Sequence, residues 1–305
     1  MQVQIEEYIE KMLTYKKPLF IHGIGNFFTE ILEEIKQFKK NNFLLFLRSF
    51  GLSDRIFYLY KYDKRGIPVS LLFNILNEYK KITKKDTKEI TKKIFLNFCG
   101  INSRSNRPIN LPKFYSKELA YLCGFILGDG HVSKRLEVII WEETEEHTKY
   151  IVGLIERLFE YKPIVIKEKN YNIICIYSSP VHFFFTKVIG FVEGKKKSKE
   201  IVPEFINLNL EFKTDFLRGL FDSDGGVTIS KKGKKSILLS SSNDKLLNKI
   251  ALLLKNFDIN LSMYKSGNKR GFELRSFNLG EIKKFNEKIG FIHPIKHLRA
   301  IASVA

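Results

Sequence analysis

The chain has 305 residues, of which 44% are hydrophobic and 13% aromatic, so it can bury a sizeable core and is not an intrinsically disordered protein. At roughly 150 residues per domain, this length predicts about two domains. The 52 Lys and Arg residues outnumber the 33 Asp and Glu residues and give a formal net charge of +19. Such a charge favours a polyanionic partner, nucleic acid before an anionic membrane surface.

Cysteine spacing and hydropathy argue against secreted and membrane proteins. The three cysteines are far apart, which predicts neither a disulfide framework nor a zinc ribbon, and the six histidines show no ligand spacing. The start of the chain is polar and acidic, unlike a signal peptide. The longest uncharged apolar run, Leu119 to Gly128, is too short to span a bilayer. We expect a protein without membrane contact in the cytoplasm of a prokaryotic cell or inside an organelle.

Residues 1–99 are expected to form a small, mostly helical N-terminal domain. Apolar residues three and four positions apart predict short helices over residues 5–13, 28–35, 43–50, 54–60 and 66–76. Short helices broken by tight turns fit either a DNA-binding helix-turn-helix or a generic helical bundle, and the sequence leaves both open. Residues 100–112 carry Asn, Ser, Arg and two prolines without periodicity, which predicts a linker.

After the linker, one pattern occurs twice. An apolar segment ends in Asp129-Gly130 and a second one ends in Asp224-Gly225, so the two aspartates are 95 residues apart. The segments that follow each copy also correspond, as in Ile189-Gly190-Phe191 and Ile289-Gly290-Phe291. An internal repeat of about a hundred residues is therefore expected, with one copy in residues 113–200 and the other in 201–305.

Each copy shows the same order of elements. Alternating β-branched residues predict strands over 132–141, 164–167 and 173–177 in the first copy and over 227–231, 236–240, 260–265 and 272–275 in the second. Helical periodicity predicts helices over 145–159 and 181–189 in the first copy and over 244–257 and 279–289 in the second. With the motif helix in front, the order is αββαββα. The sequence therefore predicts an α+β fold in which a duplicated αββαββα core with pseudo-two-fold symmetry follows the helical domain.

The two motifs read as buried helices that end in carboxylates. Small residues stand four positions apart in each, at Gly124 and Gly128 and at Gly219 and Ser223, which lets two helix backbones approach closely. An unpaired carboxylate at a buried helix end costs on the order of several kcal/mol. A divalent cation between Asp129 and Asp224 would remove that cost, and carboxylate and backbone oxygens suit Mg²⁺.

These motifs carry a resemblance to a known family. Leu122-Cys123-Gly124-Phe125-Ile126-Leu127-Gly128-Asp129-Gly130 and Leu217-Arg218-Gly219-Leu220-Phe221-Asp222-Ser223-Asp224-Gly225 resemble the two motifs of monomeric LAGLIDADG homing endonucleases. The resemblance runs from about Leu111 to the C-terminus and includes the repeat spacing and the order of elements. It implies that the motif helices form the interface between two halves, and that each half's sheet lies in the DNA major groove.

The resemblance also implies a metal site. Asp129 and Asp224 would bind metal ions shared between two scissile phosphates, with the peptide oxygens of Gly128 and Ser223 as further ligands. Leu127 replaces the acidic residue that Asp222 keeps in the second motif, a position that usually packs or caps. Lys296 lies where the family often carries an active-site lysine, and a counterpart is expected within 195–199; phosphate anchoring remains open for both.

Contacts to DNA are expected from polar residues on or beside the predicted strands, namely Arg135, Glu137, Lys167, Lys169, Tyr171, Ser230, Lys232, Lys235, Lys265, Lys269, Arg270 and Arg275. The single tryptophan, Trp141, is expected in the core. Because the linker precedes a complete repeat, residues 100–305 are expected to fold and bind DNA without the N-terminal region.

The leading hypothesis is a monomeric, site-specific double-strand DNA endonuclease of the homing type. It would hydrolyse phosphodiester bonds with Mg²⁺ or another divalent cation at a long non-palindromic site, and belong to an intron or mobile element. The alternatives are an RNA-binding intron maturase and a DNA-binding transcriptional regulator; regulators on this scaffold tend to lose the aspartates, which are present here. An intein is disfavoured, because the chain opens with Met1 and ends Ser303-Val304-Ala305.

Overall fold

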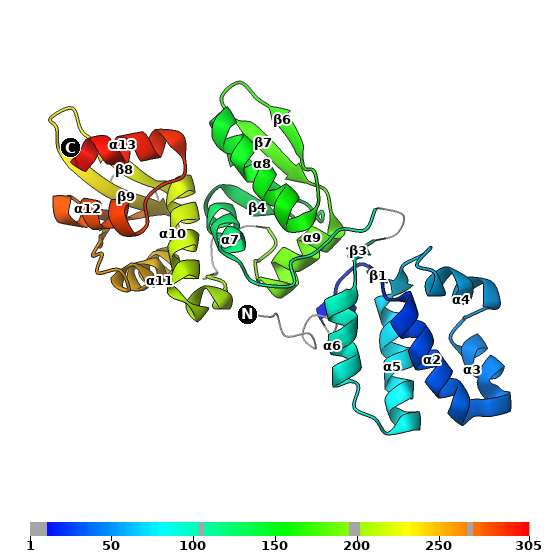
Figure 1. Ribbon diagram of the computed structural model, residues 1–305. Helices are drawn as coiled ribbons and strands as arrows, with labels where there is room; N and C mark the ends of the chain where they lie inside the picture. The colour runs from blue at the N-terminus through cyan, green and yellow to red at the C-terminus, as the bar shows by residue number, and fades with distance from the viewer. Residues whose placement is uncertain (1–10, 104–106, 195–201, 267–270, 305) are drawn as a thin grey trace. The chain divides into compact units, whose positions relative to one another are not determined.

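The computed structural model describes residues 11–103, 107–194, 202–266 and 271–304, which form two compact units (Figure 1). Residues 1–114 together with 179–188 make up the first unit, and 115–178 together with 189–305 the second. In the described part of the chain, no helix is long and apolar enough to cross a membrane. The expected lysine at 195–199 and the DNA-contact candidates Lys269 and Arg270 lie outside the described residues.

The first unit combines helices with a small sheet. Its elements are β1 (Phe20–His22), α2 (Gly25–Lys39), α3 (Phe43–Ser49), α4 (Asp54–Lys61), β2 (Ile67–Pro68), α5 (Val69–Thr83), α6 (Lys88–Asn97) and β3 (Gly100–Asn102). The strands form an antiparallel sheet in the order β2-β1-β3. The helices expected over 28–35, 43–50 and 54–60 are present, the one expected over 66–76 begins at Val69, and most of the one expected over 5–13 lies outside the described residues. The strands were not expected, because two or three residues are too few to show an alternating pattern.

The expected linker is part of the first unit where the structure describes it, over residues 100–103 and 107–112. Residues 100–102 are β3, and Ile101 forms a bridge with Ile109. Ile101, Ile109 and Leu111 are buried. This segment therefore belongs to the core of the first unit.

Residues 179–188 were expected to belong to the first repeat, but they lie in the first unit. They form α9 (Ser179–Phe183) and a π-helical turn (Phe184–Val188). The Tyr15 hydroxyl donates to the Ser179 carbonyl at 3.1 Å and lies 2.9 Å from Nδ1 of His182. Phe183, Phe184 and Phe185 are fully buried.

The second unit contains an αββαββ arrangement twice, and within this unit only the second copy continues into a closing helix. The first copy consists of α7 (Lys117–Asp129), β4 (Gly130–Val132), β5 (Val138–Glu142), α8 (Glu145–Phe159), β6 (Ile164–Lys167) and β7 (Asn172–Ile176). The second consists of α10 (Leu210–Asp224), β8 (Gly225–Ile229), β9 (Lys235–Ser241), α11 (Asp244–Lys255), β10 (Ser262–Lys265), β11 (Phe272–Ser276) and α12 (Leu279–Lys288), followed by α13 (Pro294–Val304). The antiparallel sheets have the orders β4-β5-β7-β6 and β8-β9-β11-β10, which correspond strand for strand. The predicted α+β fold with a duplicated core is confirmed.

The two motif helices begin and end in corresponding ways. Ser116 caps α7 and Asn209 caps α10, each accepting a backbone N–H three residues on. Both helices end at a glycine. A Cβ at Gly130 would lie 2.6 Å from the Ile126 Cα, and one at Gly225 2.6 Å from Cδ1 of Phe221. The chain can therefore turn from the aspartate directly into the first strand of each sheet.

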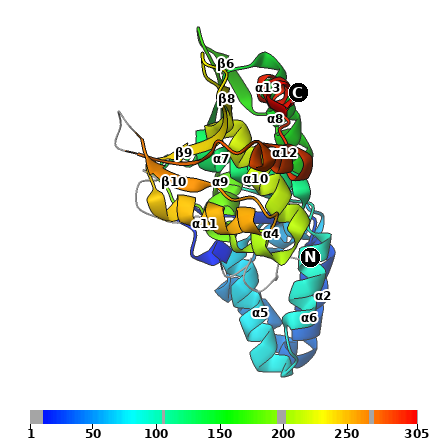
Figure 2. The same cartoon turned by 90° about the vertical axis from the view of Figure 1, so that its left-hand side faces the viewer.

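Each sheet has one covered and one open face. Helix α8 packs on β5 and β7. Helices α11 and α12 pack on the second sheet, and Figure 2 shows them beside β9 and β10. The covered faces carry alternating buried residues: Val138, Ile140, Ile174 and Ile176 in the first copy, and Val227, Ile237, Leu239 and Leu274 in the second. Side chains at the intervening strand positions are mostly exposed or half-buried. We call these the open faces.

Candidate functional site

Helices α7 and α10 pack side by side (Figure 1) and approach each other closely at two glycines. A Cβ at Gly124 would collide with the carbonyl oxygen of Phe216, and a Cβ at Gly219 with that of Tyr121. The symmetric contact means that each glycine admits the backbone of the other helix. The small residues predicted to bring two backbones together do so.

The close contact extends to the C-terminal ends of the two helices. A Cβ at Gly128 would collide with the Ser223 side chain and lie 3.3 Å from Cγ of Asp224. Asp129 and Asp224 are the last residues of their helices; Asp129 is half-buried and Asp224 is exposed. The structure therefore brings together the four residues that the sequence nominated as metal ligands.

Lys296 lies at the end of α10. Its ammonium donates to the carbonyl oxygens of Phe221, Asp222 and Ser223 at 3.3, 2.6 and 2.5 Å. A positive charge is favourable there, because the carbonyls of a helix C-terminus carry partial negative charge. Burial lowers the pKa of the ammonium, although the carboxylates of Asp222 and Asp129 oppose that shift. The lysine is thus fixed close to both aspartates.

A cavity adjoins these groups. Its volume is ≈ 330 Å³, and its lining includes Asp129, Ser223 and Lys296. Trp141 and Tyr171, from the first copy, line it as well. Residues nominated from both motifs and from the C-terminal segment therefore face one space.

Asp222 connects the copies, which goes beyond the packing or capping role expected for its position. Its Oδ2 accepts from the Tyr121 hydroxyl at 2.8 Å and from the Ile292 N–H at 3.0 Å. Burial raises the pKa of this carboxyl group, and both hydrogen bonds oppose the shift. Because Ile292 precedes α13, Asp222 fixes the segment that carries Lys296.

The DNA-contact candidates divide by sheet face. Lys167 pairs with Asn172, whose side chain bonds to Thr148 of α8, so Lys167 lies on the covered side, where it contacts Glu145 at 3.3 Å. By the same register, Lys235 and Lys265 follow the covered face of the second sheet. These three lysines do not belong to the open faces, because adjacent strand positions point to opposite sides.

The remaining candidates lie on an open face or in exposed connections. Arg275 is on the open face of the second sheet and pairs with Glu273 at 3.0 Å. Arg135, Lys169, Ser230 and Lys232 are exposed in turns between strands, Tyr171 is exposed just before β7, and Glu137 is half-buried before β5. Trp141, expected in the core, is 37% exposed on the open face of the first sheet.

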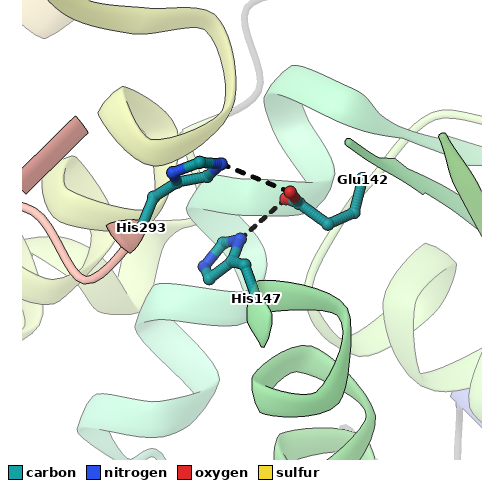
Figure 3. A group of neighbouring side chains, drawn as sticks. All are labelled: Glu142, His147 and His293. Carbon is teal, nitrogen blue, oxygen red and sulfur yellow. Dashed lines mark hydrogen bonds and ion pairs between the residues drawn. The ribbon is translucent and has the colours of Figure 1, made fainter. Parts of the chain in front are cut away.

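A buried polar cluster was not foreseen (Figure 3). One oxygen of Glu142 lies 2.7 Å from Nδ1 of His147, and the other lies 3.3 Å from Nε2 of His293. Burial alone would raise the pKa of Glu142, but the bonds from both histidines and from the Thr144 N–H lower it overall. Glu142 and His147 are five residues apart, but His293 lies about 150 residues further on, so the sequence shows no ligand spacing for the cluster.

The duplicated unit, joined along two glycine-bearing helices that end in neighbouring aspartates, defines a class of pseudo-symmetric α+β proteins. A family model described as a LAGLIDADG-like domain matches residues 211–290, from α10 to the end of α12. The second copy therefore matches a LAGLIDADG-like domain.

Curated relatives match over part of their length. The NrdEB alpha subunit of ribonucleoside-diphosphate reductase from Bacillus subtilis is 28% identical over 193 residues, covering 58% of this chain and 17% of that protein. The replication factor C small subunit of Methanocaldococcus jannaschii is 29% identical (58% and 10%), and the tRNA-splicing ligase RtcB of Pyrococcus abyssi 28% (61% and 23%). The chain therefore spans less than a quarter of each of these proteins.

Solved structures show more distant likeness. The homing endonuclease I-DmoI in complex with DNA and Mn is 20% identical with a TM-score of 0.44, covering 57% of this chain and 96% of that chain. Full-length DUF199/WhiA from Thermatoga maritima is 22% identical with a TM-score of 0.43, covering 64% and 63%. Identities and TM-scores this low do not assign an activity to this chain.

Proposed function

We propose that this protein is a site-specific endonuclease that cuts both strands of double-stranded DNA and needs Mg²⁺ or another divalent cation. The observation that carries the proposal is the meeting of the two helix ends, which carry Asp129 and Asp224, with Asp129, Ser223 and Lys296 lining one cavity. A pair of carboxylates at such a contact can hold a divalent cation for phosphodiester hydrolysis.

The residues at the helix ends fit a hard divalent cation. Carboxylate oxygens of Asp129 and Asp224 and the carbonyl oxygens of Gly128 and Ser223 are the donor types that Mg²⁺ prefers. When bound, such a cation lowers the pKa of an attacking water and neutralises charge on the phosphate. The Lys296 ammonium already occupies one acceptor position of the Ser223 carbonyl, which leaves that oxygen a second lone pair.

The rest of the site suits a phosphodiester substrate. Lys296 offers a fixed positive charge where negative charge develops during hydrolysis, which favours the transition state. The net charge of +19 attracts the DNA backbone. Arg275 and the exposed residues in the strand connections would contact phosphates or base edges.

The relatives support the homing type. Their names describe a reductase, a replication factor and an RNA ligase, which share no chemistry, yet each matches about the same length of this chain. A segment that occurs in unrelated proteins and forms a small part of each behaves as an inserted element. A homing endonuclease is an enzyme that would spread such an element.

The experiment compares Asp129→Asn and Asp224→Asn with the unchanged protein on a duplex made by joining the two sequences that flank its coding element. Each variant should lose double-strand cleavage while its DNA affinity changes only a few-fold, because the amide keeps the size of the carboxylate and loses its charge. Asp244→Asn, at an exposed helix start, is the control and should cleave normally. Undiminished cleavage by either motif variant would refute the proposal, and binding without any cleavage by the unchanged protein would favour a regulator.

A further inference from the structure

The cluster formed by Glu142, His147 and His293 is almost completely buried, with exposed fractions of 4%, 1% and 5%. Glu142 ends β5, His147 lies in the first turn of α8, and His293 directly precedes α13. Figure 3 shows both imidazole rings directed at the carboxylate between them. The cluster therefore joins the first copy to the C-terminal segment of the second.

The fold does not require this cluster, because the other copy is built without it. Thr144 and Asn243 cap α8 and α11 in the same way, each accepting a backbone N–H three residues on, from His147 and from Leu246. The N–H groups of these caps in turn bond to Glu142 and to Ser241. Ser241 and Leu246 thus stand where the first copy has Glu142 and His147. The buried His147 thus occupies a position where the apolar Leu246 serves equally well in the other copy. An ionisable side chain at such a position indicates a function other than folding.

The donor set and its spacing suit a transition-metal ion. One ligand atom from each residue can be chosen so that all lie within 4.8 Å of one another. Zn²⁺ binds His nitrogen and Glu oxygen at about 2.0–2.2 Å, which places ligand atoms of a tetrahedral site about 3.3–3.5 Å apart. The two histidine nitrogens lie 2.7 and 3.3 Å from different oxygens of the carboxylate. Side-chain rotation would have to bring one ligand atom of each residue from within 4.8 Å to that spacing. Two histidines and one glutamate are also a common zinc set.

The surroundings complete part of such a site. Nε2 of His147 lies 2.7 Å from the Tyr121 hydroxyl, which donates to Asp222, so the ring that would bind metal through Nδ1 is held by a hydrogen bond on its other side. Nδ1 of His293 has no hydrogen-bond partner in the described part of the chain. Glu142 and His293 both line the ≈ 330 Å³ cavity, which has room for a water as fourth ligand.

We propose that Glu142, His147 and His293 bind Zn²⁺ or a similar transition-metal ion, separately from the aspartates at the helix ends. The bound ion links β5 and α8 of the first copy to the segment before α13 and so fixes the helix that carries Lys296. Soft-to-borderline nitrogen ligands favour Zn²⁺ over Mg²⁺ at this place, whereas the oxygen donors of Asp129 and Asp224 favour Mg²⁺. The proposal does not depend on nuclease activity.

The test titrates Zn²⁺ into the full chain after dialysis against a chelator, and measures bound metal by mass spectrometry and calorimetry. We expect one Zn²⁺ per chain that an excess of Mg²⁺ does not displace, a rise in Tm, and a visible Co²⁺ spectrum of low coordination number. His147→Leu and His293→Gln should abolish all three. His147→Leu introduces the residue that Leu246 supplies in the other copy, so the variant should fold, which circular dichroism checks.

Two further variants make the test specific. Tyr121→Phe, which matches Phe216 of the second motif, removes the hydrogen bond behind His147 and should weaken Zn²⁺ binding by about 10–100-fold without abolishing it. His297→Gln, at an exposed position one turn into α13, is the control and should bind Zn²⁺ normally. The double variant with Asp129→Asn and Asp224→Asn should also keep its Zn²⁺. If the unchanged protein binds no Zn²⁺, or if both cluster variants bind as it does, the proposal is wrong.

Discussion

At the scale of single residues, contact rather than backbone conformation determines where glycine is needed in the motif helices. Gly124 and Gly219 are helical, yet each faces a carbonyl oxygen of the opposite helix. Gly153 of α8 is also helical, but a Cβ there would meet only the end of the Arg157 side chain, at 3.4 Å. The two kinds of helical glycine should therefore respond to substitution in opposite directions.

We predict that Gly124→Ala destabilises the protein by about 1–3 kcal/mol or more, because backbone atoms of Phe216 must move. Gly153→Ala should leave stability unchanged or raise it by up to about 1 kcal/mol, because alanine restricts the unfolded chain and favours the helix. Denaturant unfolding of both variants measures the difference. Equal effects would show that the helices do not approach as closely as described.

Lys296 allows stability and catalysis to be separated. Lys296→Met keeps the apolar stem but removes the donor to three carbonyl oxygens, and we expect the cleavage rate to fall by about 10²-fold with little loss of DNA affinity. Lys288→Met is the matched control, since Lys288 also donates to a carbonyl, that of Phe257 at 2.9 Å, as well as to Asp258. If the cleavage rate falls equally in both variants and follows the fall in Tm, Lys296 has only a structural role.

At the scale of elements, the sequence predicted most of the second unit. Helix α8 spans Glu145–Phe159 and β6 spans Ile164–Lys167, both as expected, because a capping Thr144 and a regular apolar pattern define them locally. Strands β1 and β3 were missed because they are only three residues long. The face on which Lys167 lies depends on strand register, which a single strand does not reveal.

The same distinction applies to the site. Asp129 and Asp224 could be found because the motif is repeated. By contrast, the Glu142 cluster brings together the end of β5, the first turn of α8 and the residue before α13, and only tertiary structure shows this. Trp141 was expected inside because it ends an apolar strand, but strand alternation places it on the open face.

The open face of the first sheet can be tested with its tryptophan. Trp141 is the only tryptophan in the chain, and it lines the cavity beside Asp129. If DNA lies against this face, a bound duplex should shift the emission of Trp141 and protect it from quenching by acrylamide. A Trp141→Phe variant carrying Tyr264→Trp reports the open face of the second sheet in the same way. Unchanged emission from both proteins at saturating DNA would place the duplex elsewhere.

At the scale of the whole molecule, the two copies share a fold but present different open faces. The first presents mainly apolar side chains, namely Ile139, Trp141, Ile164, Ile166 and Ile173, whereas the second presents mostly polar ones, namely Thr228, Ser240, Ser262, Tyr264, Glu273 and Arg275. Apolar groups contact thymine methyls, while arginine pairs with guanine. Unlike surfaces imply unlike half-sites.

We therefore predict that one chain binds a non-palindromic duplex, with an affinity that falls steeply with salt because phosphate neutralisation releases counterions. Selection from a random duplex library identifies the site, and sedimentation of the complex gives the number of chains. A palindromic site occupied by two chains would contradict the prediction.

The path of the chain between the two units has a consequence for exchange between relatives. The polypeptide passes from one unit to the other after residue 114, after 178 and again after 188. Residues 179–188 contact Tyr15, and β3 pairs with β1. A fragment of residues 100–305 would keep both of these segments and lose the residues that they contact. The N-terminal unit is thus built from two separate stretches of the chain, and the second of these lies inside the sequence of the other unit. A graft of residues 1–114 onto a relative must bring residues 179–188 with it, which makes the unit hard to gain or lose in a single recombination.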